Sequence, residues 1–327
     1  MPELMKATVF RQTGGPEVLE IAEAPVPAVG PGQVLVKQLA IGINFIDTYH
    51  RSGLYPVKLP SRIGMEGAGV VEAVGDGVTR FKAGDQIAYA SGPLGAYAEY
   101  HTIAADRAVK LPEGISAEVG AAAMLKGMTA EFLLRRCYPL KAGETILVHA
   151  AAGGVGSILV QWAKHIGATV IGTVGSQEKA ERARALGADH VILYREQDVA
   201  SEVRRFTDGV GVPVAYDSVG AATFEGTLAS LARRGLFVSF GNASGPVPAF
   251  EPARLQRAGS LFFTRPTMND YQVTTEELDE SAAALFEVIR SGAVKIEIGQ
   301  TFRLTQARTA HEALHSRETV GASLLIP

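Results

Sequence analysis

The chain has 327 residues, more than one hydrophobic core usually serves, so two domains are expected. Its 31 Lys and Arg against 34 Asp and Glu, a net charge of -3, exclude a strongly basic protein that binds nucleic acid or an anionic membrane. The single cysteine, Cys137, excludes an intrachain disulfide framework and a zinc site of several thiolates, and it fits a reducing cytoplasm.

The N-terminal segment has no apolar core behind basic residues, so we expect no targeting signal there. The longest apolar stretch, residues 146–163, is interrupted by Gly153, Gly154 and Gly156. This pattern predicts a strand, a turn and a helix instead of a membrane span. We therefore expect a cytoplasmic protein that acts on small molecules.

Short β-rich runs separated by turn residues dominate the first part of the chain. They lie at residues 33–40, 69–74 and 85–89. Residues 1–125 are therefore expected to form a compact, mostly β domain.

From about residue 126 the pattern changes to strands that alternate with helical segments. A helix is predicted over residues 155–166, with Gly167 as its C-terminal stop. The strands are predicted at residues 145–149, 169–174, 191–193, 214–218, 236–240 and 261–263. This alternation indicates an α/β domain over residues 126–265 with a doubly wound parallel sheet, as in a Rossmann fold.

The remaining residues, 266–327, are expected to rejoin and complete the first domain. A long helical pattern covers residues 275–290, followed by a strand near 295–298 and a short helix around 306–315. A final apolar run covers residues 323–326.

One glycine-rich turn carries the clearest functional signal. The segment Ala151-Ala152-Gly153-Gly154-Val155-Gly156 lies between a predicted strand and a predicted helix, and matches the Gly-x-Gly-x-x-Gly fingerprint with alanine at its first position. Gly153 lets the backbone approach a pyrophosphate, Gly156 allows the helix to pack closely on the strand, and the N-terminal amides attract the anion. The alternative is an ordinary tight turn, and the strand–turn–helix context favours a dinucleotide site instead.

The end of the second predicted strand indicates which dinucleotide binds. NAD-selective sites carry an acidic residue about twenty positions past the fingerprint, and here Gly175 and Ser176 occupy that place. Lys179, one helical turn further on, can make a charge-assisted contact with a 2′-phosphate, and Tyr194 can close over that phosphate or the adenine. Glu178 is interpreted as a solvated residue of the first helical turn. We therefore expect NADPH as the cofactor.

Several segments together resemble the medium-chain dehydrogenase/reductase superfamily. They are Gly64-Met65-Glu66-Gly67-Ala68-Gly69, Lys82-Ala83-Gly84-Asp85, Gly127-Met128-Thr129-Ala130 and the glycine turn. The segment from Gly42 to Tyr49, followed by Arg51-Ser52-Gly53-Leu54-Tyr55, is similar to the zinc-independent, zeta-crystallin-like NADPH:quinone oxidoreductases. Tyr216-Asp217-Ser218-Val219-Gly220, Phe240-Gly241-Asn242 and the final Ser-Leu-Leu-Ile-Pro strengthen the resemblance to the bacterial quinone reductases.

The resemblance implies a GroES-like barrel joined to a Rossmann domain, with the substrate in the cleft between them. Zinc-dependent alcohol dehydrogenases of the superfamily have a cysteine at the position of Asn44 and a histidine at that of Met65, and the lobe that holds their structural zinc has no counterpart here. Hydride transfer is therefore expected to need no metal, and to depend on orientation and polar contacts.

The expected site residues follow from the resemblance together with the turn and the strand ends. Asn44, Tyr49 and Tyr55 would line the pocket where a quinone meets the nicotinamide, and Asn44 and Tyr49 would also touch the cofactor. Tyr49 is a possible proton donor, but it can equally serve as a shape element, because water can protonate the reduced quinone. The cofactor-binding residues would be Thr129, Gly153, Gly154, Val155, Gly175, Ser176, Lys179, Tyr194, Ser218, Phe240, Gly241, Asn242, Phe263 and Arg265.

Other patterns compete with this interpretation. His311-Glu312-Ala313-Leu314-His315 matches a zinc-protease motif, but the nearest following carboxylate is Glu318, so we interpret the segment as a solvated polar helix face. Asn242-Ala243-Ser244 fits a glycosylation pattern, taken here as chance in a chain without a secretion signal. Cys137 is expected to be a small buried residue, and His50 to lie at the surface.

The function expected is that of an NADPH:quinone oxidoreductase, the first of three interpretations that the residues allow. The alternatives are an NADPH-dependent reductase of activated carbon–carbon double bonds and a non-enzymatic, crystallin-like NADPH-binding protein. The apolar segments 236–240 and 260–263 would leave an exposed sheet edge, which the family usually pairs across a homodimer.

Overall fold

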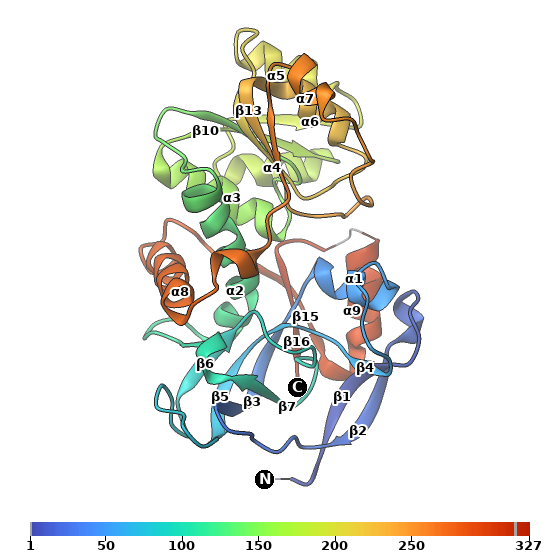
Figure 1. Cartoon of the computed structure of the whole chain (residues 1–327), viewed down its shortest axis with the longest axis vertical. Helices are drawn as coiled ribbons and strands as arrows, with labels where there is room; N and C mark the ends of the chain where they lie inside the picture. Colours follow the sequence, from blue (N-terminus) through green and yellow to red (C-terminus); the bar gives the residue numbers. More distant parts are fainter. Residues whose placement is uncertain (1, 317–318) are drawn as a thin grey trace. The chain divides into compact units, whose positions relative to one another are not determined.

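The computed structural model describes residues 2–316 and 319–327 (Figure 1). The chain divides into two compact units. The first unit comprises Met1–Met128, Gln272–Arg290 and Ile296–Pro327, and the second comprises Thr129–Tyr271 and Ser291–Lys295. The first division falls inside a single helix, α2 (Ala117–Phe132), which also contains the boundary predicted after residue 125. The second division, after Tyr271, lies six residues beyond the boundary predicted after residue 265.

The second unit contains a six-stranded parallel sheet with strand order β11-β10-β9-β12-β13-β14. Its strands are β9 (Thr145–Val148), β10 (Thr169–Val174), β11 (His190–Leu193), β12 (Val212–Asp217), β13 (Leu231–Ser239) and β14 (Phe262–Thr264). The order reverses between β9 and β12, which is the switch point of a doubly wound sheet. The predicted parallel sheet is confirmed, although β13 begins at Leu231 instead of residue 236.

Helices connect these strands, as the alternating pattern predicted. They are α3 (Gly154–Ile166), α4 (Gln177–Ala185), α5 (Val199–Phe206), α6 (Phe224–Ser230) and α7 (Ala253–Arg257). Gly167 caps α3 in the left-handed conformation, with a φ of 98°, which confirms the predicted stop. A π-helical turn, Leu133–Cys137, follows α2. No helix in the described part of the chain is long and apolar enough to cross a membrane.

The first unit is built on two sheets, one of seven strands and one of three. In the larger sheet the order is β15-β16-β3-β5-β6-β8, with β7 also paired to β3; the smaller has the order β2-β1-β4. The strands are β1 (Leu4–Phe10), β2 (Glu20–Pro25), β3 (Gln33–Ile43), β4 (Ser61–Arg62), β5 (Glu66–Val74), β6 (Gln86–Tyr89), β7 (Tyr100–Ala104), β8 (Ala108–Lys110), β15 (Ile298–Arg303) and β16 (Ala322–Ile326).

Three further helices complete the first unit. They are α1 (Phe45–Ser52), α8 (Thr275–Arg290) and α9 (Ala307–His315). Short 3-10 segments are Pro16–Val18, Ala105–Arg107 and Leu304–Gln306, and a fourth, Met268–Tyr271, belongs to the second unit. The helix predicted over residues 275–290 is confirmed as α8. The strand expected near residues 295–298 instead begins at Ile298 and pairs in parallel with β16.

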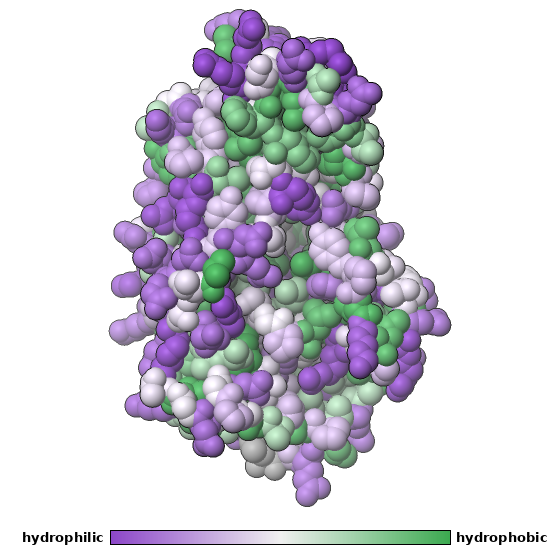
Figure 2. Space-filling model, viewed as in Figure 1, coloured by the Kyte–Doolittle hydropathy of each residue, from purple (hydrophilic) through white to green (hydrophobic). Residues whose placement is uncertain are grey.

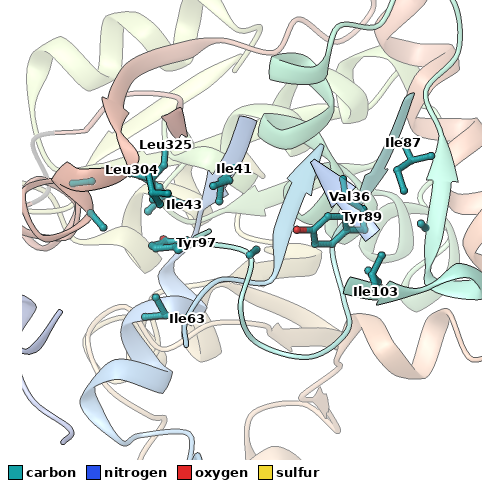
Figure 3. Close-up of a cluster of buried hydrophobic side chains, with 14 of the residues drawn as sticks. Val36, Ile41, Ile43, Ile63, Ile87, Tyr89, Tyr97, Ile103, Leu304 and Leu325 are labelled. Carbon is teal, nitrogen blue, oxygen red and sulfur yellow. The ribbon is translucent and has the colours of Figure 1, made fainter. Parts of the chain in front are cut away.

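The main core of the first unit lies against the larger sheet, where aliphatic side chains surround two buried tyrosines (Figure 3). Tyr97 lies beside Ile43 and Leu304, which brings β3 and the C-terminal part of the chain into one apolar cluster. The antiparallel pairing of β16 with β3 joins the same two parts through the backbone. The end of β3, where Asn44 follows, is therefore fixed by both packing and hydrogen bonds.

Candidate active site

The predicted cofactor residues gather at one edge of the second unit's sheet. Because its strands are all parallel, their carboxyl ends lie at that same edge. The residues that follow or end these strands are Gly153, Gly154 and Val155 after β9, Gly175 and Ser176 after β10, Tyr194 after β11, Ser218 after β12, Phe240, Gly241 and Asn242 after β13, and Phe263 and Arg265 at β14. Thr129 differs from them, because it lies in α2.

The glycine turn between β9 and α3 is held close to the helix that follows it. Ala150 has a φ of 51°, the left-handed region, and its carbonyl oxygen accepts a hydrogen bond of 2.8 Å from the Gly153 N–H. A Cβ added at Gly156 would lie only 2.2 Å from that same oxygen, so only glycine allows α3 to start here. The turn thus presents the N-terminal amides of α3, the arrangement that binds a phosphate anion.

At the end of β10, Gly175 packs directly against Tyr194. A Cβ at Gly175 would lie 2.6 Å from the Tyr194 hydroxyl oxygen. The Ser176 hydroxyl caps α4 by accepting from the Lys179 N–H at 3.4 Å, which places Lys179 in the first turn of that helix. Glu178 is exposed in the same turn, as predicted. Gly175, Tyr194 and the base of Lys179 are therefore neighbours, and neither Gly175 nor Ser176 carries a negative charge.

The loop after β12 is shaped by a buried carboxylate. Asp217 accepts hydrogen bonds from the Val219 N–H at 2.7 Å and the Gly220 N–H at 3.0 Å, the two residues that follow Ser218. Gly241 packs on the same bend, since a Cβ there would lie 2.4 Å from the Ser218 carbonyl oxygen. The structure therefore brings Ser218 and Gly241 together.

The Phe263 side chain is used for packing. Its ring lies 5.0 Å from that of Phe237 and 5.3 Å from that of Phe250, measured between centroids. It belongs to the periphery of the second unit's core. Only part of this side chain remains available for a ligand, whereas Arg265 is exposed.

A buried polar network that the sequence did not indicate joins three strand ends under the glycine turn. His149, directly after β9, has its Nδ1 2.9 Å from the Thr173 hydroxyl of β10 and its Nε2 2.8 Å from the Thr227 hydroxyl of α6. Thr227 in turn donates to Asp217 at 2.8 Å. Burial lowers the pKa of His149, so the imidazole is neutral in this network. The only sequence feature that could have predicted this network was a polar residue at or near the end of each of these buried strands.

In the first unit, Asn44 lies at the junction of β3 and α1 and is 4% exposed. Its Nδ2 donates to a Glu66 carboxylate oxygen at 2.7 Å, which fixes the orientation of the amide. Glu66 is fully buried and also accepts from the Leu125 N–H at 2.6 Å and the Lys126 ammonium at 3.3 Å. The buried ion pair of Glu66 and Lys126 therefore holds the amide of Asn44. The only sequence feature that pointed to this ion pair was the presence of charged residues within apolar segments.

Tyr49 and Tyr55 lie together at the two sides of the bend that ends α1. Their ring centroids are 5.3 Å apart in an edge-on arrangement, and the Tyr55 N–H donates to the Tyr49 carbonyl oxygen at 3.0 Å. The His50 ring also contacts Tyr55, at 5.8 Å between centroids. The expectation that His50 lies at the surface is wrong, because this packing partly buries it, and burial lowers the pKa of its imidazole.

Comparison with known proteins identifies the chain's family. Residues 30–113 match the alcohol dehydrogenase GroES-like domain, and residues 154–287 match the domain described as zinc-binding dehydrogenase. A quinone oxidoreductase of Pseudomonas aeruginosa is 53% identical over 99% of this chain and 100% of its own length. A 2-haloacrylate reductase of a Burkholderia species is 42% identical over 99% of both chains.

A solved structure agrees with these similarities. The crystal structure of Escherichia coli quinone oxidoreductase complexed with NADPH has a TM-score of 0.97 and 50% identity, and the match covers 98% of this chain and 100% of that one. The chain belongs to the quinone oxidoreductase family of medium-chain dehydrogenase/reductases. The predicted combination of a GroES-like domain and a Rossmann domain is confirmed.

In this quinone oxidoreductase family member the His-Glu-x-x-His segment is not a solvated polar helix face, so that prediction is wrong. His311 is fully buried, whereas His315, one turn along α9, is exposed. The two imidazoles therefore do not face one ligand, and Glu318 lies outside the described residues. Across residues 2–316 and 319–327, no three His, Cys, Asp or Glu side chains are grouped so that they could hold a metal ion.

Cys137 also differs from its prediction. It lies in the π-helical turn and is half-buried instead of buried. Burial raises the pKa of its thiol, and a hydrogen bond with Tyr271 lowers it. The raised pKa disfavours the reactive thiolate.

Proposed function

We propose that this family member is an NADPH:quinone oxidoreductase, which transfers hydride from NADPH to a quinone without a metal ion. The observation that carries the proposal is similarity along the whole chain to proteins named quinone oxidoreductase, at 53% identity for the Pseudomonas aeruginosa relative. The NADPH complex of the Escherichia coli relative supports the choice of cofactor.

The second unit fits NADPH chemically. The pyrophosphate would be held by the amides of Gly154 and Val155 at the N-terminus of α3, beside Gly153. The 2′-phosphate would meet Lys179, with Gly175 and Ser176 leaving room and no negative charge, and Tyr194 alongside. We assign the rest of the cofactor's surface to Thr129, Ser218, Phe240, Gly241, Asn242, Phe263 and Arg265.

In the first unit we assign contact with the electron acceptor to Asn44, Tyr49 and Tyr55. Bound NADPH supplies the hydride, and the chain supplies binding and orientation. The Asn44 amide is held by Glu66, so it loses little conformational freedom when it binds a carbonyl group. The packed rings of Tyr49 and Tyr55 present an apolar surface suited to a planar ring. A reduced quinone is a stabilised phenolate, so water can provide the proton.

One relative favours a second candidate function. The 42% identical protein is named 2-haloacrylate reductase, and its name describes reduction of an acrylate, an activated carbon–carbon double bond. Reduction of an enone or an enoyl thioester would use the same hydride donor.

A panel of acceptors distinguishes these functions. Purified protein is mixed with NADPH and with quinones, enals, haloacrylates or enoyl thioesters, and NADPH oxidation is followed by absorbance. We expect the largest kcat/KM with a quinone. A larger value with an acrylate or enone would assign the second function, and tight NADPH binding without oxidation by any acceptor would favour a non-enzymatic, crystallin-like role.

We further propose that the protein is a cytoplasmic homodimer. The single cysteine fits a reducing compartment. The support for a dimer is β14, which ends the parallel sheet, pairs there only with β13 among the described strands, and carries Phe262 at 61% exposure. Figure 2 shows further apolar residues at the surface of the second unit.

A further inference from the structure

The buried histidine of α9 has a role that the metal-like motif does not suggest. His311 is fully buried, and both of its ring nitrogens have partners from other elements. Its Nδ1 lies 3.0 Å from Nη1 of Arg51, and its Nε2 lies 3.1 Å from the Tyr97 hydroxyl oxygen. Tyr97 also contacts Asp47, at 2.9 Å from its hydroxyl to the carboxylate.

The chemistry of these groups fixes the direction of every hydrogen bond. A guanidinium can only donate, so Nδ1 of His311 must accept from Arg51. A neutral imidazole then carries its hydrogen on Nε2 and donates it to the Tyr97 oxygen. The Tyr97 hydrogen is left for the Asp47 carboxylate, so the chain runs in one direction, from Arg51 to Asp47.

The protonation state agrees with this geometry. Burial, and then the positive charge of Arg51, lower the pKa of His311 to about 3. The imidazole is therefore neutral near pH 7, as the direction of the hydrogen bonds requires.

The two ends of this chain of hydrogen bonds lie on one helix. Asp47 and Arg51 both belong to α1 and flank Tyr49 in the sequence. The Asp47 carboxylate also accepts from the N–H of Asn44, the N-cap residue just before the helix, at 2.8 Å. Arg51 Nε donates to the Gly14 carbonyl oxygen at 3.2 Å. His311 therefore links the beginning and the end of α1 through the buried interior of the first unit.

We infer that His311, with its hydrogen on Nε2, is a positioning residue for the acceptor site, because it fixes the helix that carries Asn44 and Tyr49. This rests on the proposed function, in which those two side chains contact the acceptor. His311 itself need not touch the acceptor. Its effect is on the orientation of α1, through Arg51 on one side and through Tyr97 and Asp47 on the other.

The tautomer is tested by ¹⁵N NMR of the imidazole groups in the intact, ligand-free protein at pH 7. We expect one ring with an unprotonated Nδ1 and a protonated Nε2, and the signal should be absent from His311→Gln. A His311 ring that carries its hydrogen on Nδ1, or a doubly protonated ring, would overturn the inference. This measurement needs no substrate, so it stands even if the protein reduces no quinone.

The positioning role is tested with His311→Leu, which removes both hydrogen bonds, and His315→Leu, a control at the exposed histidine of the same helix. For His311→Leu, kcat/KM for the acceptor should fall by about ten- to a hundredfold, because small displacements of site residues are costly. The dissociation constant of NADPH, measured by fluorescence, should change far less than kcat/KM, because most of the expected cofactor-binding residues lie in the second unit. All constants of His315→Leu should stay unchanged within about twofold.

Two further variants separate positioning from general destabilisation. The amide of His311→Gln can accept from Arg51 and donate to Tyr97, so it should recover most of the lost kcat/KM. Tyr97→Phe should reduce kcat/KM like His311→Leu, and the double variant should lose little more, because both interrupt one chain. If His311→Leu only lowered the melting temperature, with unchanged kcat/KM at 25 °C, His311 would be structural and the inference wrong.

If the wild-type protein preferred an enone or acrylate over every quinone, the same variants would be assayed with that acceptor. The expected pattern is the same, since the inference concerns the orientation of α1. A wild-type protein without quinone activity would contradict the proposed function, whereas unchanged kinetics in His311→Leu would contradict the positioning role, so the two results are distinguishable.

Discussion

At the scale of single residues, the preference for NADPH over NADH is predicted to depend on Lys179. Its place in the first turn of α4, next to Gly175 and Tyr194, allows an ammonium contact with a 2′-phosphate, which NADH lacks. In Lys179→Ala, the KM for NADPH should rise about tenfold or more while that for NADH stays nearly constant. Steady-state kinetics with both cofactors measure the ratio.

The neighbouring Glu178 provides the control for Lys179, because it is exposed in the same helical turn. Glu178→Ala should leave the ratio unchanged or shift it slightly toward NADPH. An unaltered ratio in Lys179→Ala would mean that another residue recognises the phosphate.

Tyr49 gives a second prediction at this scale, about the source of the proton. We expect Tyr49→Phe to keep kcat with a quinone within about threefold, because a reduced quinone needs no strong acid, whereas loss of a general acid costs about a hundredfold or more. The phenyl ring retains the edge-on contact with Tyr55. A rapid-mixing assay of NADPH oxidation measures the rate, and a hundredfold loss would identify Tyr49 as the acid.

At the scale of elements, β14 is predicted to form the dimer interface. A lysine in place of Phe262 puts a charge on the terminal strand of the sheet and should convert the dimer to a monomer in multi-angle light scattering. Val210, which is 65% exposed in the same unit, offers the matched control Val210→Lys, which should remain dimeric. A wild-type protein that is already monomeric would refute the proposed dimer.

The success of sequence-based prediction differed between elements for physical reasons. The strands of the parallel sheet are buried on both faces, so they appear as short apolar runs between turns, and β9 and β10 were located correctly. Helix α2 was missed because it is apolar on nearly all sides and rich in alanine and glycine, so it has no amphipathic period. Helix α1 has only 8 residues, too few for a clear period.

The candidate site was predictable only where the chain itself carries the pattern. The glycine turn and Lys179 lie in a continuous segment that matches a pattern with a known mechanism, so the sequence alone suffices to predict their role. The partners of Asn44 do not lie in one continuous segment with it, because Glu66 belongs to β5 and Lys126 to α2. His311 was misinterpreted for the same reason, because its partners Arg51 and Tyr97 are distant in sequence.

At the scale of the whole molecule, buried imidazoles make the stability depend on pH. Burial, and then the positive charge of Arg62, lower the pKa of His101 to about 3, against 6.5 in the unfolded chain. Between these values the unfolded state binds the extra proton, so the free energy of unfolding falls as the pH decreases below about 6.5. This group alone contributes about 1.4 kcal/mol per pH unit.

His101→Phe removes this dependence and is the test. In urea unfolding at pH 7, 6 and 5, the wild type should lose stability relative to the variant by about 0.7 kcal/mol between pH 7 and 6 and by about 1.2 kcal/mol between pH 6 and 5. Asp47 acts in the opposite direction, because burial raises the pKa of its carboxyl to about 7, so it favours the folded state as the pH decreases from 7 toward 3.8. Parallel stability curves for wild type and variant would show that His101 is not buried as a neutral ring.

The pairing of β3 with β16 also has a consequence for the order in which the protein can fold during synthesis. All six strands of the parallel sheet lie between residues 145 and 264, so the ribosome releases them together, and that sheet can form while translation continues. The end of β3, at Ile41–Ile43, can pair only after Leu325, Leu324 and Ser323 have been translated, some 280 residues later. Until then the nascent chain exposes an unpaired strand edge beside Asn44, and slow translation of the codons for β16 would prolong its exposure to chaperones and aggregation.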